Sequence, residues 1–167
     1  LEPRQGEGSI AFESIAPGLE KIGVMTPYAP LFQLILDKFK KPVIATSGNV
    51  SGSPIIYDNE EARNELSTIA DHVISNNRDI IIPQDDSVFS FSTSKQRIIL
   101  RRSRGLAPSM LDHNLRLKQK SILALGADMK AAFAMTHHEY VYVSQYLGDM
   151  DSYLTQKHFE RTLTHLS

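Results

Sequence analysis

Three stretches of the chain have the residue pattern of helices, over residues 28–40, 59–70 and 152–166. In the first, apolar residues recur every three or four positions, as they do along one face of a helix. The second opens with the sequence DNEE, in which an acidic cap is followed three residues later by a glutamate, the form of a capping box. In the third, the residues expected to face inward are Tyr153, Phe159, Leu163 and Leu166.

Short apolar runs predict strands between and after these helices. The first four are residues 22–25, 43–45, 72–75 and 80–82. Residues 87–92 and 96–101 flank a short polar turn and predict an antiparallel hairpin. Further strands are expected at residues 122–125, 131–136 and 140–144. Alternating strands and helices followed by a hairpin predict an α/β fold with a sheet of mixed direction.

A polar segment, residues 109–120, is predicted to be a linker between two domains. The first domain would span residues 1–108 and the second residues 121–167. The second is too short to bury a stable core by itself. We therefore expect it to pack on the first domain, on another copy of the chain, or on parts of a longer protein.

The composition narrows the classes of function. The chain has 167 residues, of which 41% are hydrophobic, a formal net charge of −1 and no cysteine. This net charge gives no bulk attraction to nucleic acid or membranes, so local clusters must carry any such function. The absence of cysteine excludes disulfides, thiolate zinc sites and a cysteine nucleophile. No apolar run approaches the roughly 20 residues of a transmembrane helix, which predicts a soluble, cytoplasmic protein.

The most distinctive polar stretch follows the apolar run 43–45. Hydroxyl and amide side chains are gathered there at Thr46, Ser47, Asn49, Ser51 and Ser53. Two glycines between them let the backbone bend and turn its N–H groups toward a ligand. The stretch is therefore a candidate cradle for phosphate or carboxylate, and the alternative is an ordinary strand-to-helix turn.

A basic run ends the predicted hairpin. Arg101, Arg102 and Arg104 lie within four positions, and guanidinium groups bind phosphate and carboxylate through paired hydrogen bonds. Ser87, at the start of the hairpin, is placed with them in the first candidate site. The acidic pair at positions 85–86 would either bind magnesium or hold the arginines in place. The alternatives are a solvated strand end and a solvated turn.

The second candidate site is the glycine turn GADMK, which contains Gly126, Asp128 and Lys130. A phosphate-binding hairpin has this composition, and so does any hairpin with a polar tip. The adjacent histidines at positions 137–138 would point to opposite faces of a strand, so we expect solvated turn residues and no metal site there.

Several separate runs resemble one family, the hydrogenase maturation carbamoyltransferases. The YrdC-like domain of that family is similar to the runs GVMTPYAPLFQLIL, VIATSGNVSGSPIIYDNEEA, NNRDI, DDSV and LRRSRGLAP. The start of its actin-like transfer domain is similar to LALGADMKAAFAM and YVYVSQYLGDM. The resemblance implies a partial YrdC-like domain with a mixed twisted sheet, followed by the first hairpin, strand and helix of an actin-like domain.

The resemblance also implies a chemistry. Such enzymes convert carbamoyl phosphate and ATP into carbamoyl-adenylate and pass the carbamoyl group to the C-terminal cysteine of the protein HypE, on the way to the cyanide ligands of [NiFe]-hydrogenase. By the same resemblance, ATP is the expected cofactor, together with magnesium.

Site residues follow from the resemblance as well. In the YrdC-like part, contacts to the nucleotide are implied for Ser47, Asn49, Ser87 and either Arg101 or Arg102. In the actin-like part, ATP phosphates would be bound by Gly126, Asp128 and Lys130.

The sequence also departs from the family pattern. YrdC-like domains of this family open with a Lys-x-Arg element that grips the nucleotide, and no such element stands ahead of the similar runs quoted above. The family's cysteine-rich zinc-binding region has no counterpart in the sequence either. Ala131-Ala132 stands where Asn-Thr is expected after the glycine turn. We therefore expect a fragment of a carbamoyltransferase that binds ATP weakly and has little or no turnover alone, with zinc confined to other parts of the family's proteins.

Two other functions stay open. An RNA-binding YrdC-like module is suggested by a basic cluster of Lys95, Arg97, Arg101, Arg102 and Arg104. An inert fragment that forms homo-oligomers through open sheet edges is the other possibility.

Overall fold

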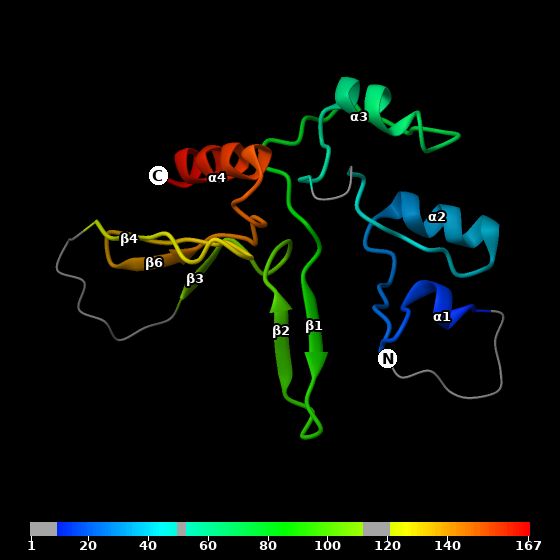
Figure 1. Ribbon diagram of the computed structural model, residues 1–167, viewed down its shortest axis with the longest axis horizontal. Coiled ribbons are helices and arrows are strands. Elements are labelled where there is room, and N and C mark those ends of the chain that lie inside the picture. The colour runs from blue at the N-terminus through cyan, green and yellow to red at the C-terminus, as the bar shows by residue number, and fades with distance from the viewer. Residues whose placement is uncertain (1–9, 50–52, 112–120) are drawn as a thin grey trace. The chain divides into compact units, whose positions relative to one another are not determined.

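The computed structural model describes residues 10–49, 53–111 and 121–167, which Figure 1 shows in colour. The chain divides into two packed units, Leu1–Ala45 and Thr46–Ser167. The division falls inside the apolar and polar stretch at residues 41–57, so the candidate cradle belongs to the second unit. All described residues of both candidate sites belong to that unit as well.

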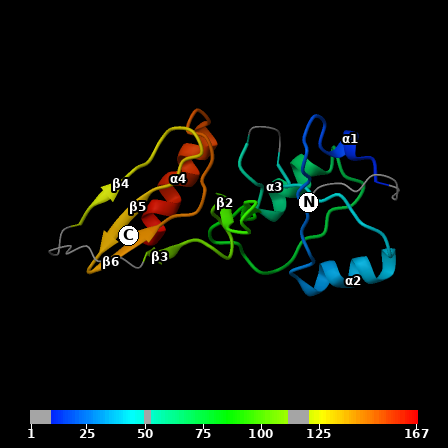
Figure 2. The same ribbon diagram turned by 90° about the horizontal axis from the view of Figure 1, so that it is seen from below.

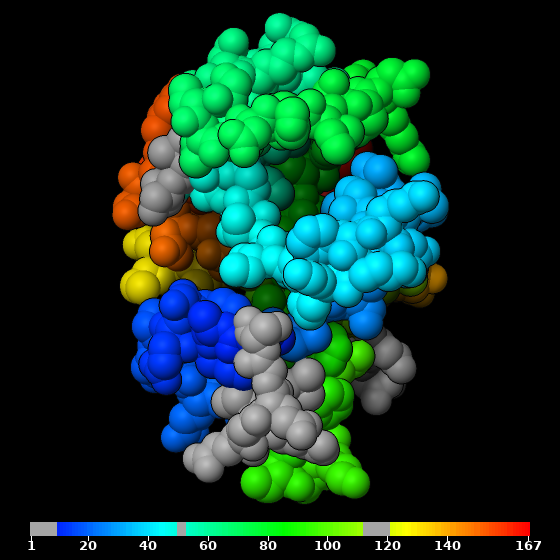
Figure 3. All heavy atoms as spheres, turned by 90° about the vertical axis from the view of Figure 1, so that its right-hand side faces the viewer, coloured from blue at the N-terminus to red at the C-terminus, as the bar shows by residue number. Residues whose placement is uncertain are grey.

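The first unit contains the helices α1 (Phe12–Ile15) and α2 (Pro30–Phe39). Helix α2 confirms the helix predicted over residues 28–40, and residues at its two ends determine where it begins and stops. Pro30 occupies the first helical position, where no backbone N–H is needed, and Lys40 ends the helix in the left-handed conformation with its N–H bonded to the Leu36 carbonyl at 2.8 Å. Its apolar side chains remain exposed, among them Leu34 at 63%; α2 is the light blue surface in Figure 3.

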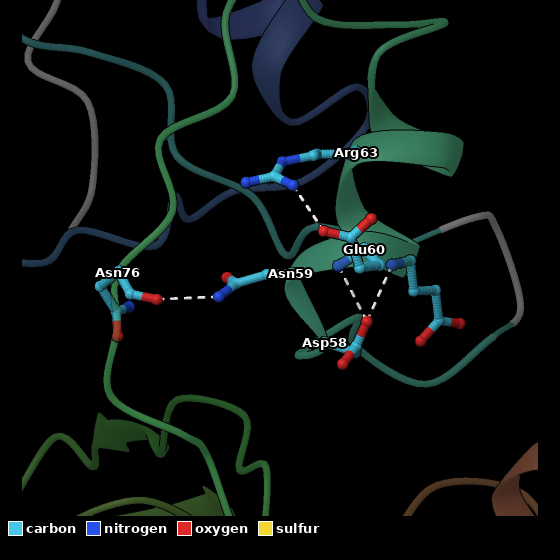
Figure 4. Close-up of polar contacts among 6 residues, drawn as sticks. Asp58, Asn59, Glu60, Arg63 and Asn76 are labelled. Carbon is cyan, nitrogen blue, oxygen red and sulfur yellow. Dashed lines mark hydrogen bonds and ion pairs between the residues drawn. The ribbon is translucent and has the colours of Figure 1, made fainter.

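Helix α3 (Asn59–Leu66) is the first helix of the second unit, and it begins directly after Asp58, the cap residue that the sequence predicted. The Asp58 carboxylate accepts hydrogen bonds from the backbone N–H groups of Glu60 and Glu61, both at 2.9 Å (Figure 4). The Asn59 side chain donates to the Asn76 carbonyl at 2.8 Å, which ties the helix to a turn further along the chain. The cap satisfies two of the N–H groups that a helix start leaves unpaired.

Four predicted strands do not form in the described residues: 22–25, 43–45, 72–75 and 80–82 have no strand pairing there. Their apolar side chains are exposed, with Ile44 at 79% and Ile74 at 75%. A strand exists only through hydrogen bonds to a neighbour, whereas an apolar run specifies only that its side chains favour burial. The prediction of strand structure at these positions was therefore wrong for this chain.

The predicted hairpin is confirmed as strands β1 (Val88–Phe91) and β2 (Arg97–Arg101), paired antiparallel. Lys95 makes the turn with a φ of 62°. A single parallel bridge joins Asp86 and Arg104 beyond the hairpin, so the chain segments on both sides of it stay together after the strands end.

The second sheet has four strands in the order β3-β6-β5-β4, all antiparallel. They are β3 (Ser109–Leu111), β4 (Leu123–Ala124), β5 (Ala134–His137) and β6 (Tyr140–Val143), and helix α4 (Tyr153–Leu166) follows (Figure 2). The last three strands and the helix lie where they were predicted. Strand β3 corrects the predicted linker, because residues 109–111 pair with β6 and leave only 112–120, which lie outside the described residues.

The best-packed core lies between this sheet and α4. Phe133 is 1% exposed and its ring is 5.3 Å from that of Phe159 on α4. Two buried polar groups meet nearby, the Gln145 amide donating to the Thr162 hydroxyl at 3.5 Å. Phe159 therefore faces inward as predicted, whereas Tyr153 is 68% exposed and was wrongly assigned to the inward face.

Helix α4 also contacts segments far back in the chain. The Arg161 guanidinium lies 5.2 Å from the centre of the Tyr57 ring and donates a hydrogen bond to its hydroxyl. The backbone of Pro83 lies beside the His158 imidazole and acts to raise its pKa against the larger effect of burial, and the buried Nε2 has no hydrogen-bond partner among the described residues. The helix thus joins its own sheet to residues 57 and 83 within one unit.

We predict that Phe133→Ala lowers the free energy of unfolding by about 3–5 kcal/mol, because it opens a cavity under α4. Phe91→Ala is the matched control, since Phe91 is 57% exposed, and its cost is about 1 kcal/mol or less. Urea denaturation followed by circular dichroism measures both. Equal losses for the two variants would contradict the placement of the core.

The stability of the chain should also depend on pH through His158. Burial lowers the pKa of its imidazole below the usual value. The unfolded chain then binds more protons than the folded chain near pH 6, so stability decreases as the pH falls through about 6.5. His158→Gln should reduce this decrease when urea midpoints are compared between about pH 5.5 and about pH 7.5.

His165→Gln is the control for that measurement, because His165 lies exposed on the last turn of the same helix. His158→Gln should reduce the pH dependence by more than His165→Gln does, because His158 is the buried imidazole of the two. An identical pH dependence in the His158→Gln variant and the parent chain would refute the role of His158.

Candidate functional site

The polar loop at residues 46–57 is closed by hydrogen bonds of its own. Ser47 donates to the Asn49 side-chain oxygen, and the Asn49 amide donates to the Ser53 carbonyl at 3.0 Å. The Ile56 N–H donates to the Gly48 carbonyl at 2.9 Å. Thr46 and Ser47 are exposed and Asn49 is half-buried, so the Thr46 and Ser47 hydroxyl groups lie at the surface.

Of the predicted residues in this loop, Ser51 lies outside the described residues. Thr46, Ser47 and Asn49 lie together, as their spacing requires. Neither of the two pockets described below is lined by them.

Ser87 holds two segments of the chain together. Its hydroxyl donates to the Arg104 carbonyl and accepts from the Ser103 N–H, both at 2.9 Å. The Asp85 carbonyl also accepts the Arg104 N–H at 3.1 Å. In this structure the hydroxyl predicted to contact a nucleotide therefore positions the arginine run.

The three arginines of that run have different surroundings. Arg104 forms an ion pair with Asp86, with 2.5 Å between Nη2 and Oδ1. Of the two roles predicted for the acidic pair at positions 85–86, magnesium binding or holding the arginines, Asp86 thus has the second. Arg102 has a buried Nε without a hydrogen-bond partner among the described residues, and its carbonyl accepts the Tyr146 N–H at 2.7 Å. The Arg101 guanidinium lies 5.1 Å from the centre of the Tyr146 ring.

The glycine turn of the second candidate site is fixed against residues 148–150. Gly126 has a φ of 77°, and a Cβ there would lie 2.2 Å from the Ala132 carbonyl oxygen, so only glycine fits. The Lys130 N–H donates to the Asp149 carboxylate at 2.6 Å, and the Asp128 carbonyl accepts the Met150 N–H at 2.8 Å. The turn therefore has a structural reason for its glycine besides any ligand.

A pocket of about 160 Å³ brings one residue of each candidate site together. It is lined by Val88, Leu100, Arg101, Lys130 and Tyr146. Arg101 and Lys130 were assigned from sequence to separate sites, and only the fold places them in one cavity. A second pocket, of about 460 Å³, lies against β4, β5 and the last turns of α4 and includes Leu123, Met135 and Leu163.

Tyr146 is the residue that sequence reasoning missed. Burial and the nearby Asp149 carboxylate raise the pKa of its phenol above the usual value, with Arg101 acting in the opposite direction. The phenol therefore stays protonated at neutral pH and remains a hydrogen-bond donor. No sequence signal marked it, because a tyrosine after a strand is an ordinary core residue.

Metal binding has no support in the described residues, where no three histidine, aspartate or glutamate side chains lie close enough to share an ion. The rings of His137 and His138 contact each other edge to face, 4.3 Å apart, and both residues are exposed. Within the same described part of the chain, no helix has the length and apolarity needed to cross a membrane.

Comparison with known proteins gives two family matches. Residues 4–103 match the Sua5/YciO/YrdC family, described as telomere recombination, and this is more than half of the chain. The chain belongs to the Sua5/YciO/YrdC family. Beyond this YrdC-like part, residues 117–167 match the HypF Kae1-like domain.

Curated relatives of this YrdC-like chain carry the name carbamoyltransferase HypF. The protein of a Synechocystis species is 43% identical over 158 residues, which cover 95% of this chain and 20% of the relative. That of Rhizobium leguminosarum bv. viciae is 35% identical over 159 residues, covering 91% and 21%. The chain thus spans about a fifth of the length of these relatives, and the resemblance to the maturation carbamoyltransferases is confirmed.

Two solved structures have the same fold. Full-length HypF in the phosphate- and nucleotide-bound form aligns with a TM-score of 0.83 at 40% identity, over 89% of this chain and 23% of that chain. HypF of T. kodakarensis aligns with a TM-score of 0.82 at 36% identity, over 92% and 20%. The predicted fold class, a partial YrdC-like domain followed by the start of the next domain, is confirmed.

We predict that Ser87→Ala lowers the free energy of unfolding by about 1 kcal/mol, since it removes a hydroxyl that bonds two segments at once. Ser87→Thr retains the hydroxyl and should lose less. Urea denaturation measures both effects. A Ser87→Ala variant as stable as the parent would show that the Ser103–Arg104 segment is held by other contacts.

Proposed function

We propose that this chain is part of a carbamoyltransferase that forms carbamoyl-adenylate from carbamoyl phosphate and ATP and transfers the carbamoyl group to the C-terminal cysteine of HypE. The observation that carries the proposal is the shared name of the curated relatives, carbamoyltransferase HypF, over 95% of this chain in the first of them. Nucleotide binding is supported by the related HypF structure, which is in a phosphate- and nucleotide-bound form.

The proposed reaction has two group transfers. Water first hydrolyses carbamoyl phosphate to carbamate and inorganic phosphate. A carbamate oxygen then bonds to the α-phosphorus of ATP, and pyrophosphate leaves. The acceptor thiolate then attacks the carbonyl carbon and AMP leaves. Both steps redistribute negative charge over phosphate oxygens, so the protein's contribution is to position the substrates and to stabilise that charge.

This chain would contribute donors from two places. The loop with Thr46, Ser47 and Asn49 supplies hydroxyl and amide groups on a closed backbone. Arg101 supplies a guanidinium that is in no ion pair among the described residues. Ser87 contributes by holding the segment that follows Arg101.

Magnesium is not proposed to be held by this chain. Asp86 is paired with Arg104, and in the described residues no three acidic or histidine side chains are placed to share one metal ion. A magnesium ion that accompanies ATP takes most of its ligands from phosphate oxygens and water. We also propose that the chain is divided into domains at residues 1–108 and 121–167, and the two separate family matches, over residues 4–103 and 117–167, support this proposal.

The test of the nucleotide site is a calorimetric titration of the chain with ATP and magnesium. The double variant Ser47→Ala with Asn49→Ala should weaken binding about tenfold, because two donors to phosphate are lost. Ser92→Ala with Ser94→Ala is the matched control, since these two hydroxyls bond each other in the exposed hairpin turn. Unchanged affinity in the first double variant would refute the assignment of the loop.

RNA binding and self-association remain the other two predictions. Two further measurements, of RNA binding and of particle size, distinguish them from nucleotide binding. RNA binding that falls steeply with salt and does not compete with ATP would favour the RNA-binding module. A particle size that rises with protein concentration, without a response to nucleotide, would favour self-association.

A further inference from the structure

The pocket shared by the two candidate sites has the properties of a small-anion site. Arg101 comes from the YrdC-like match and Lys130 from the HypF Kae1-like match, and both line the same cavity of about 160 Å³. We propose that this pocket binds one phosphate-type dianion, held by both parts of the chain together. The proposal goes beyond the nucleotide loop, and it rests on the proposed function only in naming carbamoyl phosphate as a ligand.

The two cations are held in place by different means. Arg101 ends strand β2 opposite Val88, and its guanidinium lies over the Tyr146 ring. Lys130 is fixed at its backbone, with a φ of 52° and its N–H bonded to Asp149. Neither side chain is in an ion pair among the residues that the structure describes, so both charges are available to a ligand.

The third polar group is a neutral donor. The Tyr146 phenol is protonated at neutral pH, as any tyrosine with an ordinary pKa of about 10 is, and burial moves its pKa further up. A protonated phenol donates a hydrogen bond to an anionic oxygen. The same phenol lies within electrostatic reach of the Asp149 and Asp85 carboxylates. Asp149 already accepts the Lys130 N–H, and the two acids together limit the excess of positive charge. Two cations partly offset by two nearby carboxylates favour a ligand with one phosphate group over a more highly charged polyphosphate.

The size of the cavity leads to the same conclusion. Pockets for drug-sized ligands typically have volumes of about 300–1,000 Å³, well above the value of about 160 Å³ for this pocket. A whole nucleoside triphosphate is therefore too large, whereas a single phosphate group fits. Inorganic phosphate and carbamoyl phosphate share this chemistry.

The experiment is an NMR titration of the isotope-labelled chain with inorganic phosphate, at constant ionic strength maintained with chloride. The Lys130 and Tyr146 amide signals should shift and saturate. Lys130→Gln and Arg101→Gln should each weaken binding about tenfold, since each removes a charge-assisted hydrogen bond. Lys130→Arg should retain most of the affinity, which separates loss of charge from loss of fold.

Lys157→Gln is the control for general charge, because Lys157 is exposed and pairs with Glu160. It should leave phosphate binding unchanged. Shifts that do not saturate, or that Lys157→Gln reduces as much as Lys130→Gln does, would overturn the proposal.

Two further titrations distinguish the source of the phosphate. Carbamoyl phosphate should displace inorganic phosphate from the same amides, which supports a small acyl phosphate as the ligand. ATP that shifts these amides with equal sensitivity to Lys130→Gln would overturn the separate small-anion site and make the pocket part of the nucleotide site. Phosphate binding that survives Ser47→Ala with Asn49→Ala, while ATP binding is lost, supports the pocket as a site of its own. A chain that binds phosphate but never ATP contradicts the proposed nucleotide loop and leaves the pocket supported.

Discussion

The second unit depends on how the segment after β2 is held on both sides. Ser87 and Asp86 bind Ser103 and Arg104 from one side, while the Arg102 carbonyl accepts the Tyr146 N–H from the other. These contacts join the hairpin to the sheet of β3, β4, β5 and β6. Because most of them involve the backbone, they fix the direction of the chain and leave the Arg101 side chain facing the pocket.

A second consequence is that residues 46–103 of the YrdC-like match pack in one unit with the HypF Kae1-like match. Arg161 stacks on Tyr57, the His158 imidazole lies beside the Pro83 backbone, and the Tyr146 N–H donates to the Arg102 carbonyl. Each pair crosses from the YrdC-like match to the HypF Kae1-like match. A phosphate bound between Arg101 and Lys130 would add an ionic contact across the same boundary, so ligand binding and packing of the two parts would reinforce each other.

Predictions from the sequence were correct where the structure depends on a few neighbouring residues. The Asp58 cap, the Pro30 start of α2 and the hairpin turn at Lys95 all follow from conformational preferences of a few neighbouring residues. The strand assignments at 43–45 and 72–75 failed for the opposite reason. An apolar run does not contain its hydrogen-bond partner, and in the described residues no neighbour pairs with either run. The reverse case is β3, which forms inside a predicted linker because the edge of β6 offers a partner.

The sequence by itself determined helices α2, α3 and α4, the hairpins, the membership in the family and the residue types of both candidate sites, whereas the short helix α1 was not predicted. It did so because caps, turns and motif residues act over a few positions. Only the tertiary structure decided that Ser87 is a structural clamp, that Asp86 pairs with Arg104, and that Arg101, Lys130 and Tyr146 line one pocket. Those relations join residues that lie far apart in the chain, and the spacing of residues in a sequence carries no information on which distant backbones will meet.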